Sequence, residues 1–258
     1  MITRVMQWSV RREIWENRSI YIAPLCTALL YLFGFMLSRL SPHRIGVQRP
    51  FDAAAVILIA TAFIVAIFYC VDAMQSERRD RSILFWKSLP VSDRTTVLAK
   101  VSIPMVVIPA ITFATVVTLQ IAMLLWSTTW INVFFHALIL LYGLIVMSLW
   151  FAPIYAWLLM VSAWAKRAVV LWAVLPWMIA GMLERLIFGT SLFGFWMKQC
   201  FMGFMEAAFE TTKQGQVERL DQLRPGNFLI TPGLWTGLIV AALFLWAAVK
   251  LRRGREPI

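Results

Sequence analysis

The sequence predicts an all-α, polytopic membrane protein with six transmembrane helices. Of its 258 residues, 61% are apolar and only 14% are charged, whereas a soluble domain is about 45–50% apolar and about 25% charged. A mean hydropathy of +0.76 points the same way. A soluble fold of this length has too little interior to bury so much hydrocarbon. We therefore expect most of the apolar side chains to face lipid or the interior of a helical bundle.

Six apolar stretches are long enough to span a bilayer, which takes about 20 helical residues. They comprise residues 20–37, 53–71, 101–126, 131–164, 168–183 and 228–250. The fourth stretch exceeds one span but leaves no turn between two, and Pro153 is expected to break or kink it. No cleavage site for a signal peptidase follows the first stretch, so we expect the first span to be retained.

Basic residues set the predicted topology, because Lys and Arg collect in cytoplasmic loops. With both termini in the cytoplasm and the fourth stretch counted once, most basic residues fall on the cytoplasmic side. These are Arg4, Arg11, Arg12, Arg18, Arg78, Arg79, Arg81, Lys87, Arg94, Lys100, Lys166, Arg167, Lys250, Arg252, Arg253 and Arg255. The net charge of +11 would favour nucleic-acid binding in a soluble chain. Here topology explains it, and no nucleic-acid partner is predicted.

Two segments are neither span nor short loop. Residues 1–19 mix Arg11, Arg12, Glu13 and Trp15, which predicts a helix in the membrane interface with its indoles toward lipid and its cations toward anionic headgroups. Residues 184–227 lie outside in this topology and begin with an aromatic, Met-rich half that glycines interrupt. This composition predicts a re-entrant or surface-lying amphipathic element between spans five and six.

The residues at the start of the outer element have two possible roles. Glu184 and Arg185 either mark the outer interface or pair across helices in a translocation path. Ionisable groups are otherwise missing from the centre of the sequence, since residues 101–165 contain no Asp, Glu, Lys or Arg. An ion-coupled carrier usually keeps such a group near mid-membrane.

The chain has no motif for hydrolysis or nucleotide binding. H-E-x-x-H, G-x-S-x-G, G-x-G-x-x-G and the phosphate loop G-x-x-x-x-G-K-[ST] do not occur. Its three cysteines form no C-x-x-C, and its two histidines lie far apart. We therefore predict no catalytic residue, no metal site and no cofactor in this chain, and we do not expect it to be an enzyme.

The loop at residues 75–100 is the most informative segment. Its apolar residues predict a short amphipathic helix that stops before Pro90, after which Ser92 caps a helix leading into the third span. One interpretation is a helix that anchors the loop to lipid. The other is a rigid lever that a partner protein pushes. Its candidate coupling residues are Glu77, Arg78, Asp80, Arg81, Ser82, Trp86 and Leu89.

The sequence resembles the permease subunits of bacterial type-2 ABC exporters. The resemblance rests on Arg11-Arg12-Glu13-x-Trp15-Glu16, on Glu77-Arg78 with Ser82, on Ser88-Leu89-Pro90-Val91-Ser92, and on Lys100. It implies that residues 77–89 form a coupling helix that docks on a separate cytoplasmic ATPase present in two copies, which would hold ATP and Mg. It also implies a second permease copy, as a homodimer, and a place in the bacterial inner membrane.

The resemblance implies that the whole chain, residues 1–258, forms a single permease domain. Residues 1–19 are the interfacial helix, 20–183 hold spans one to five, 184–227 are the outer element, 228–250 are span six and 251–258 are a cytoplasmic tail. The expected function is export of an amphipathic or lipid-like cargo such as a peptide, a drug or a lipid-linked molecule. A stand-alone channel or carrier is the alternative, and a lipid-modifying membrane enzyme is a weaker one.

Overall fold

The computed structural model describes residues 2–40, 49–79, 92–127, 132–210 and 220–254. In the described ranges the chain is helical throughout, apart from short connections and one isolated bridge between Phe209 and Leu223. The helices are α1 (Ile2–Glu16), α2 (Ser19–Leu40), α3 (Pro50–Asp72), α4 (Gln75–Arg79), α6 (Asp93–Ser102), η1 (Ile103–Val107, a π-helix), α7 (Ile108–Leu125), α8 (Val133–Trp150), α9 (Ala152–Trp164), α10 (Val169–Phe188), α11 (Leu192–Ala208), η2 (Leu220–Gln222, a 3₁₀ turn), α12 (Pro225–Ile230) and α13 (Pro232–Gly254).

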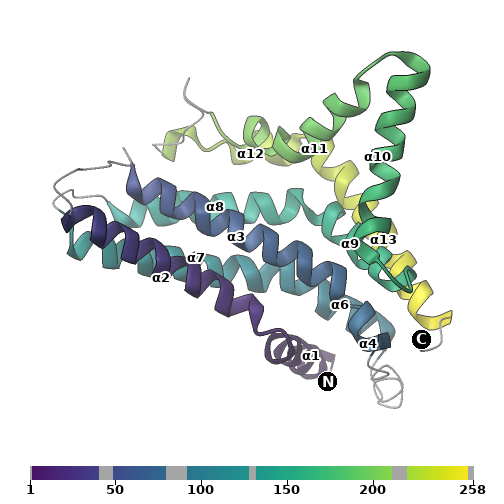
Figure 1. Cartoon of the computed structure of the whole chain (residues 1–258), viewed down its shortest axis with the longest axis horizontal. Helices are drawn as coiled ribbons and strands as arrows, with labels where there is room; N and C mark the ends of the chain where they lie inside the picture. The colour runs from purple at the N-terminus through teal and green to yellow at the C-terminus, as the bar shows by residue number, and fades with distance from the viewer. Residues whose placement is uncertain (1, 41–48, 80–91, 128–131, 211–219, 255–258) are drawn as a thin grey trace.

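Six of these helices are long and apolar enough to cross a membrane, which agrees with the predicted all-α polytopic fold. Helices α2, α3, α7 and α8 lie side by side, and α13 packs against α9 (Figure 1). Both termini lie at one end of this bundle, together with α1, α4 and α6 (Figure 1). We call this the near end and the opposite end, where α2 and α7 finish, the far end.

The third and fourth spans are not continuous α-helices. In the third, the π-helix η1 separates α6 from α7, and Pro104 and Pro109 lie in this region. In the fourth, the helix ends at Trp150 and resumes at Ala152, with Pro153 in the first turn of α9. The break at Phe151 agrees with the interruption expected from Pro153, because proline cannot donate a backbone hydrogen bond to the preceding turn.

The fifth predicted span, α10, stands at a steep angle to α2, α3, α7 and α8 (Figure 1). Only 6% of its most apolar 18-residue stretch is buried within the chain. Many of its own apolar side chains are exposed, including those of Leu171, Met178, Met182 and Leu186. A helix that is apolar on all sides gains stability only when lipid or another protein surface covers it. The chain by itself leaves α10 largely uncovered.

Local sequence explains where several helices begin. The Ser92 hydroxyl accepts a hydrogen bond from the backbone of Thr95 at 3.2 Å, as expected for an N-cap. The last span begins at Pro232, four residues later than residue 228. The earlier residues form α12, and the Thr231 hydroxyl donates to the carbonyl of Asn227 at 2.8 Å. The predicted apolar stretch from residue 228 thus counts part of the short helix α12 together with the last span.

Candidate functional site

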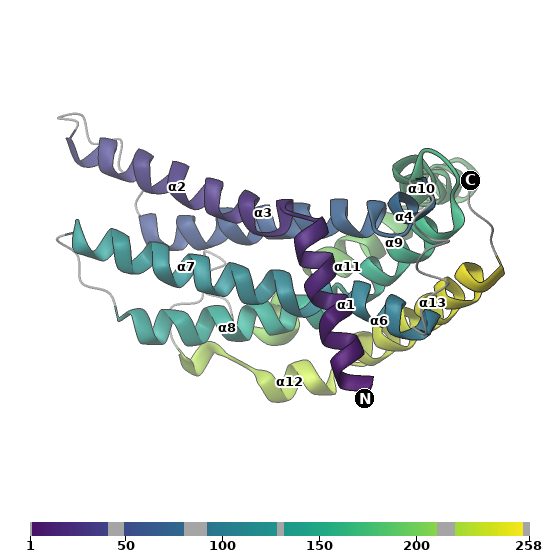
Figure 2. The ribbon, with the colours of Figure 1, turned by 90° about the horizontal axis from the view of Figure 1, so that it is seen from below.

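Helix α1 crosses the near end of the bundle and packs against α6 (Figure 2). Its inward face carries Val10, Glu13 and Ile14, of which Val10 and Ile14 pack against the near-end core. Its side-chain amide at Asn17 donates to the carbonyl of Glu13 at 3.1 Å, which closes the helix before α2 begins. The helix therefore buries a carboxylate where an amphipathic helix usually buries only apolar groups.

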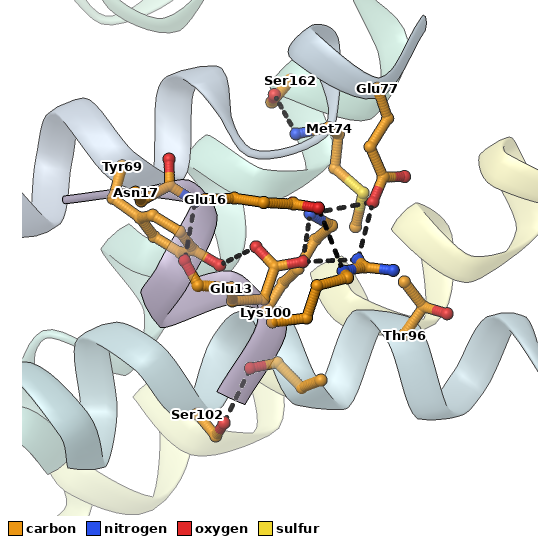
Figure 3. Close-up of polar contacts among 12 residues, drawn as sticks. Glu13, Glu16, Asn17, Tyr69, Met74, Glu77, Thr96, Lys100, Ser102 and Ser162 are labelled. Atoms are coloured by element: carbon orange, nitrogen blue, oxygen red, sulfur yellow. Dashed lines mark hydrogen bonds and ion pairs between the residues drawn. The ribbon is translucent and has the colours of Figure 1, made fainter. Parts of the chain in front are cut away.

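Glu13 and Lys100 form the centre of a buried ion-pair network (Figure 3). The Lys100 ammonium donates to the Glu13 carboxylate at 2.9 Å, and the Tyr69 hydroxyl donates to its other oxygen at 2.8 Å. Glu13 is 1% exposed and Lys100 is 2% exposed. Three elements, α1, α3 and α6, thus meet at one carboxylate.

Glu77 on α4 is the second buried carboxylate of the network. Its Oε1 lies 3.1 Å from the Lys100 ammonium and 3.2 Å from the Arg12 guanidinium, and its Oε2 lies 3.1 Å from Arg252. Arg12 also binds the Glu13 carboxylate at 2.7 Å. Because Glu77 is only three residues before residue 80, the network holds the root of the 80–91 segment.

The C-terminal helix enters the network through Arg252. Its guanidinium lies against Glu77 on one side and 3.3 Å from Asp93 on the other. Arg253 lies 3.8 Å from the second oxygen of Asp93 but is mostly exposed. Asp93, placed at the start of α6 where a helix favours negative charge, therefore also fixes the end of α13.

A further contact ties α4 to the fourth span. The buried hydroxyl of Ser162 on α9 accepts hydrogen bonds from the backbone amides of Met74 and Gln75, at 3.1 and 3.2 Å (Figure 3). These amides lie in the turn between α3 and α4. The root of the 80–91 segment is thus held by α9 as well as by α1, α6 and α13.

Among the described contacts, each carboxylate of the network lies against at least one cation, which is the condition for burying ions at tolerable cost. Its cations are Arg12, Lys100, Arg252 and Arg253, and its anions are Glu13, Glu16, Glu77 and Asp93. Such a cluster adds little net stability compared with a well-packed apolar core, but losing one partner leaves a buried charge uncompensated. The arrangement therefore specifies one geometry for five helices.

Burial alone raises the pKa of Glu13, but Lys100 and Arg12 together hold that pKa below its ordinary value of 4.5. A carboxylate whose pKa is lowered by folding stabilises the fold above its ordinary pKa, and this contribution disappears as the pH falls through the folded value. We expect the unfolding midpoint of the purified chain to fall as the pH drops below about 5.

The Glu13→Gln variant isolates this contribution, because it removes the titrating group without changing its size. Its unfolding midpoint should be lower at pH 7 and should change less than that of the wild type between pH 7 and pH 4. The exposed Glu206→Gln variant is the control and should follow the wild type. An identical pH dependence for Glu13→Gln and wild type would contradict the assignment.

The outward face of α1 has a different character. Arg4, Trp8, Arg11 and Trp15 are exposed and recur every three or four residues, which places them on one stripe opposite Glu13. The exposed Arg18 follows in the turn after the helix. The Arg11 guanidinium lies 5.6 Å from the ring centre of Trp8 and 4.7 Å from that of Trp15. The spacing suits a surface of anionic headgroups above hydrocarbon.

The predicted residues of the interfacial helix and of the coupling segment fall into four groups. Arg12, Glu13 and Glu77 meet in the network, whereas Arg11 and Trp15 face outward. Arg78 lies in α4. The remaining coupling candidates, Asp80, Arg81, Ser82, Trp86 and Leu89, lie outside the described residues, and so does most of the predicted coupling helix.

Glu184 and Arg185 do not meet in the structure as an ion pair among the described contacts. The Glu184 carboxylate accepts hydrogen bonds from the Thr190 hydroxyl and from the backbone amides of Leu192 and Phe193, each at 2.7 Å. It therefore caps the first turn of α11. Arg185 is exposed on α10.

Six members of the network did not emerge as site residues from the sequence: Glu16, Tyr69, Asp93, Lys100, Arg252 and Arg253. Lys100 and Glu16 stood out only through the resemblance, and Arg252 and Arg253 only as topogenic charges. A usable signal lies in the residues around Lys100, because Val97, Ala99 and Val101 are all buried beside it. A lysine in such surroundings needs an anionic partner.

No protein-family model, curated protein sequence or solved structure matches the chain. Function is therefore argued from the membrane-spanning fold and from the network.

Proposed function

We propose that the chain is the membrane-spanning subunit of an ATP-driven exporter of the bacterial type-2 ABC class. In this proposal, a separate cytoplasmic ATPase docks on the 77–89 segment and supplies ATP and Mg, and a second copy of the chain completes the transport path. The cargo would be amphipathic or lipid-like. The near end of the bundle would face the cytoplasm of a cell whose inner membrane holds the protein.

The observation that carries this proposal is the position of Glu77. It joins the root of the docking segment directly to Lys100 below the third span and to Arg252 at the end of the last span. A force applied to the segment would therefore reach α6 and α13 through buried ion pairs rather than through a flexible linker. A loop that served only as a lipid anchor would not need such a connection.

The exposed surface of α10 supports the second copy. Its apolar residues have few partners within the chain, and a cargo path for a bulky molecule needs more than six spans. We propose that the first span and the outer half of the fifth pack against their counterparts in a homodimer.

Ion-coupled carriers also contain buried carboxylates. The buried carboxylates of this chain therefore favour a stand-alone carrier more than the sequence did. However, Glu13 and Glu77 lie at the near end, and each already has a cation within 3.2 Å. A coupling carboxylate must exchange its ion during transport, and these contacts leave it fully engaged. The ATP-driven exporter remains the better proposal.

Co-purification tests the proposal directly. The tagged chain, solubilised mildly from its native membranes, should carry an ATPase of roughly 25–35 kDa with a phosphate-loop motif, in a complex of two permeases and two ATPases. The Trp86→Ala variant should weaken this association about 30- to 1,000-fold, as expected for a hot spot worth roughly 2–4 kcal/mol. The exposed Trp246→Ala variant is the control. Recovery of an active chain with no ATPase would refute the proposal.

Cysteine labelling tests the orientation. In a background lacking Cys26, Cys70 and Cys200, a cysteine at Arg49 at the start of α3 should react with an impermeant thiol reagent added to intact cells. A cysteine at Arg94, in the first turn of α6, should react only after the membrane is opened. Labelling of both positions from the same side would overturn the six-span topology.

A further inference from the structure

Two of the clusters of buried residues, which we call the near core and the far core, lie one after the other along the length of the bundle. The near core contains Ile20 on α2, Ala66 on α3, Ile108 on α7 and Leu159 on α9, among others. The far core contains Phe35, Leu58, Met123 and Leu144, also among others. Helices α2, α3 and α7 contribute to both cores from separate stretches of their length. A boundary therefore crosses the bundle between its two ends.

Two helix interruptions lie near this boundary. The π-helix η1 begins directly after α6, three residues beyond Lys100, and Pro104 and Pro109 each remove one backbone donor there. On the neighbouring chain segment, the α8–α9 break at Phe151 interrupts the fourth span. Helix η1 contacts both α3 and α8. A π-helical turn and a proline break are the usual sites at which a long helix bends.

A small cavity of about 30 Å³, partly open to the outside of the bundle, lies at the same level. Its walls include Pro104 and Pro109 from the third span, Ser148 and Tyr155 on either side of the α8–α9 break, and Ala62 from α3. Protein interiors are close-packed, and space larger than a water molecule is scarce. Here both interrupted helices line the space, and Ala62 contributes only a small side chain to its wall.

We infer that this level is a joint, at which the near half of the bundle tilts as a unit against the far half. The ion-pair network keeps α1, α4, α6 and the end of α13 together on the near side of the joint. The interruptions in the third and fourth spans absorb the bend in those spans, and the cavity provides room for side chains to move. Helices α2 and α3 cross this level without interruption and curve smoothly. The inference does not depend on the proposed ATPase partner, since it concerns the chain alone.

Distances between spin labels test the joint in the full-length protein, reconstituted in lipid nanodiscs and diluted with unlabelled chain. One pair crosses the joint, from Leu98 on α6 to Leu141 on α8. The reference pair, Ile57 on α3 and Leu141, lies within the far half. All three positions are exposed. We expect the crossing distance distribution to be at least twice as wide as the reference distribution.

Filling the cavity should remove this difference. The Ala62→Val variant adds two methyl groups at the cavity wall, and the crossing distribution should narrow to the width of the reference pair. The matched control is Ala60→Val, two residues away on the exposed face of α3, which should leave both distributions unchanged. If Ala62→Val fails to insert, Ala66→Val fills the same cavity from one turn further along.

Two results would overturn the inference. Equally narrow distributions for both pairs in the wild type would show that the bundle moves as one rigid body. A wide crossing distribution that neither cavity-filling variant narrows would place the flexibility elsewhere. Loss of the ATPase partner in co-purification would leave these measurements unaffected, so the joint and the proposed function fail separately.

Discussion

Replacing Lys100 with Met is expected to destabilise the near end of the bundle severely. Met has a similar length but no charge, so the carboxylates of Glu13 and Glu77 lose the cation that lies within 3.1 Å of both. Removing one partner of a buried ion pair costs about 3–5 kcal/mol, because the remaining charge stays in a poorly solvated site. The free energy of unfolding in mixed micelles should fall by this amount, and α1 should become sensitive to proteolysis.

The control for this substitution is Lys198→Met on α11, where the lysine is exposed. It should leave the free energy of unfolding within about 0.5 kcal/mol of the wild type. A wild-type stability for Lys100→Met would mean that the two carboxylates find other partners, and the network would not be the structural centre of the near end.

Two adjacent arginines at the end of α13 should behave very differently. Arg252 is buried between Glu77 and Asp93, whereas 59% of the Arg253 side chain is exposed. We expect Arg252→Gln to destabilise the chain by about 3 kcal/mol, in the range for breaking a buried pair. Arg253→Gln should cost at most about 1 kcal/mol, since exposed ion pairs contribute little.

The comparison is sharp because both substitutions remove one positive charge from the same end of α13. A purely topogenic role predicts equal effects, seen as altered insertion when labelled cysteines report the orientation. The network predicts that both variants insert normally and that only Arg252→Gln unfolds at lower denaturant concentration. Equal stabilities for the two variants would contradict it.

The helices could be predicted from the sequence because hydropathy and backbone chemistry act locally. Each span is a long apolar stretch, and lipid leaves the backbone no alternative to the helix. Ser92 and Pro153 marked a helix start and a helix break, and the structure has both. The apolar stretch predicted from residue 228 includes part of the short helix α12, because α12 directly precedes the last span and shares its apolar composition.

The network could be predicted only in part, because ion pairs between distant residues leave no periodic trace. Glu13 and Lys100 are 87 positions apart, and a charged residue on a mixed helix such as α1 is expected to face water or headgroups. The sequence singled out Arg12, Glu13 and Glu77 but did not bring them together. Arg252 did not stand out in the sequence, because it is one of several basic residues that the predicted topology already explained.

The steep angle of α10 to the other helices could not be predicted from the sequence either. Its composition predicts a span, and it is long and apolar enough to be one. Composition does not determine which neighbours cover an apolar helix, since lipid, the same chain and a second copy present similar surfaces. The packing of α10 therefore depends on which of these surfaces covers it, and the sequence of one chain does not specify that.

A double-mutant cycle on Glu77 and Arg252 tests most directly whether the root of the proposed docking segment, residues 77–89, is joined to the last span. The free energy of unfolding is measured for the wild type, Glu77→Gln, Arg252→Gln and the double variant. A direct buried pair predicts a coupling energy of about 1–3 kcal/mol, so that the double variant is less destabilised than the two single effects added together. Additive effects within about 0.5 kcal/mol would show that the two residues act independently. The segment would then have no direct connection to α13.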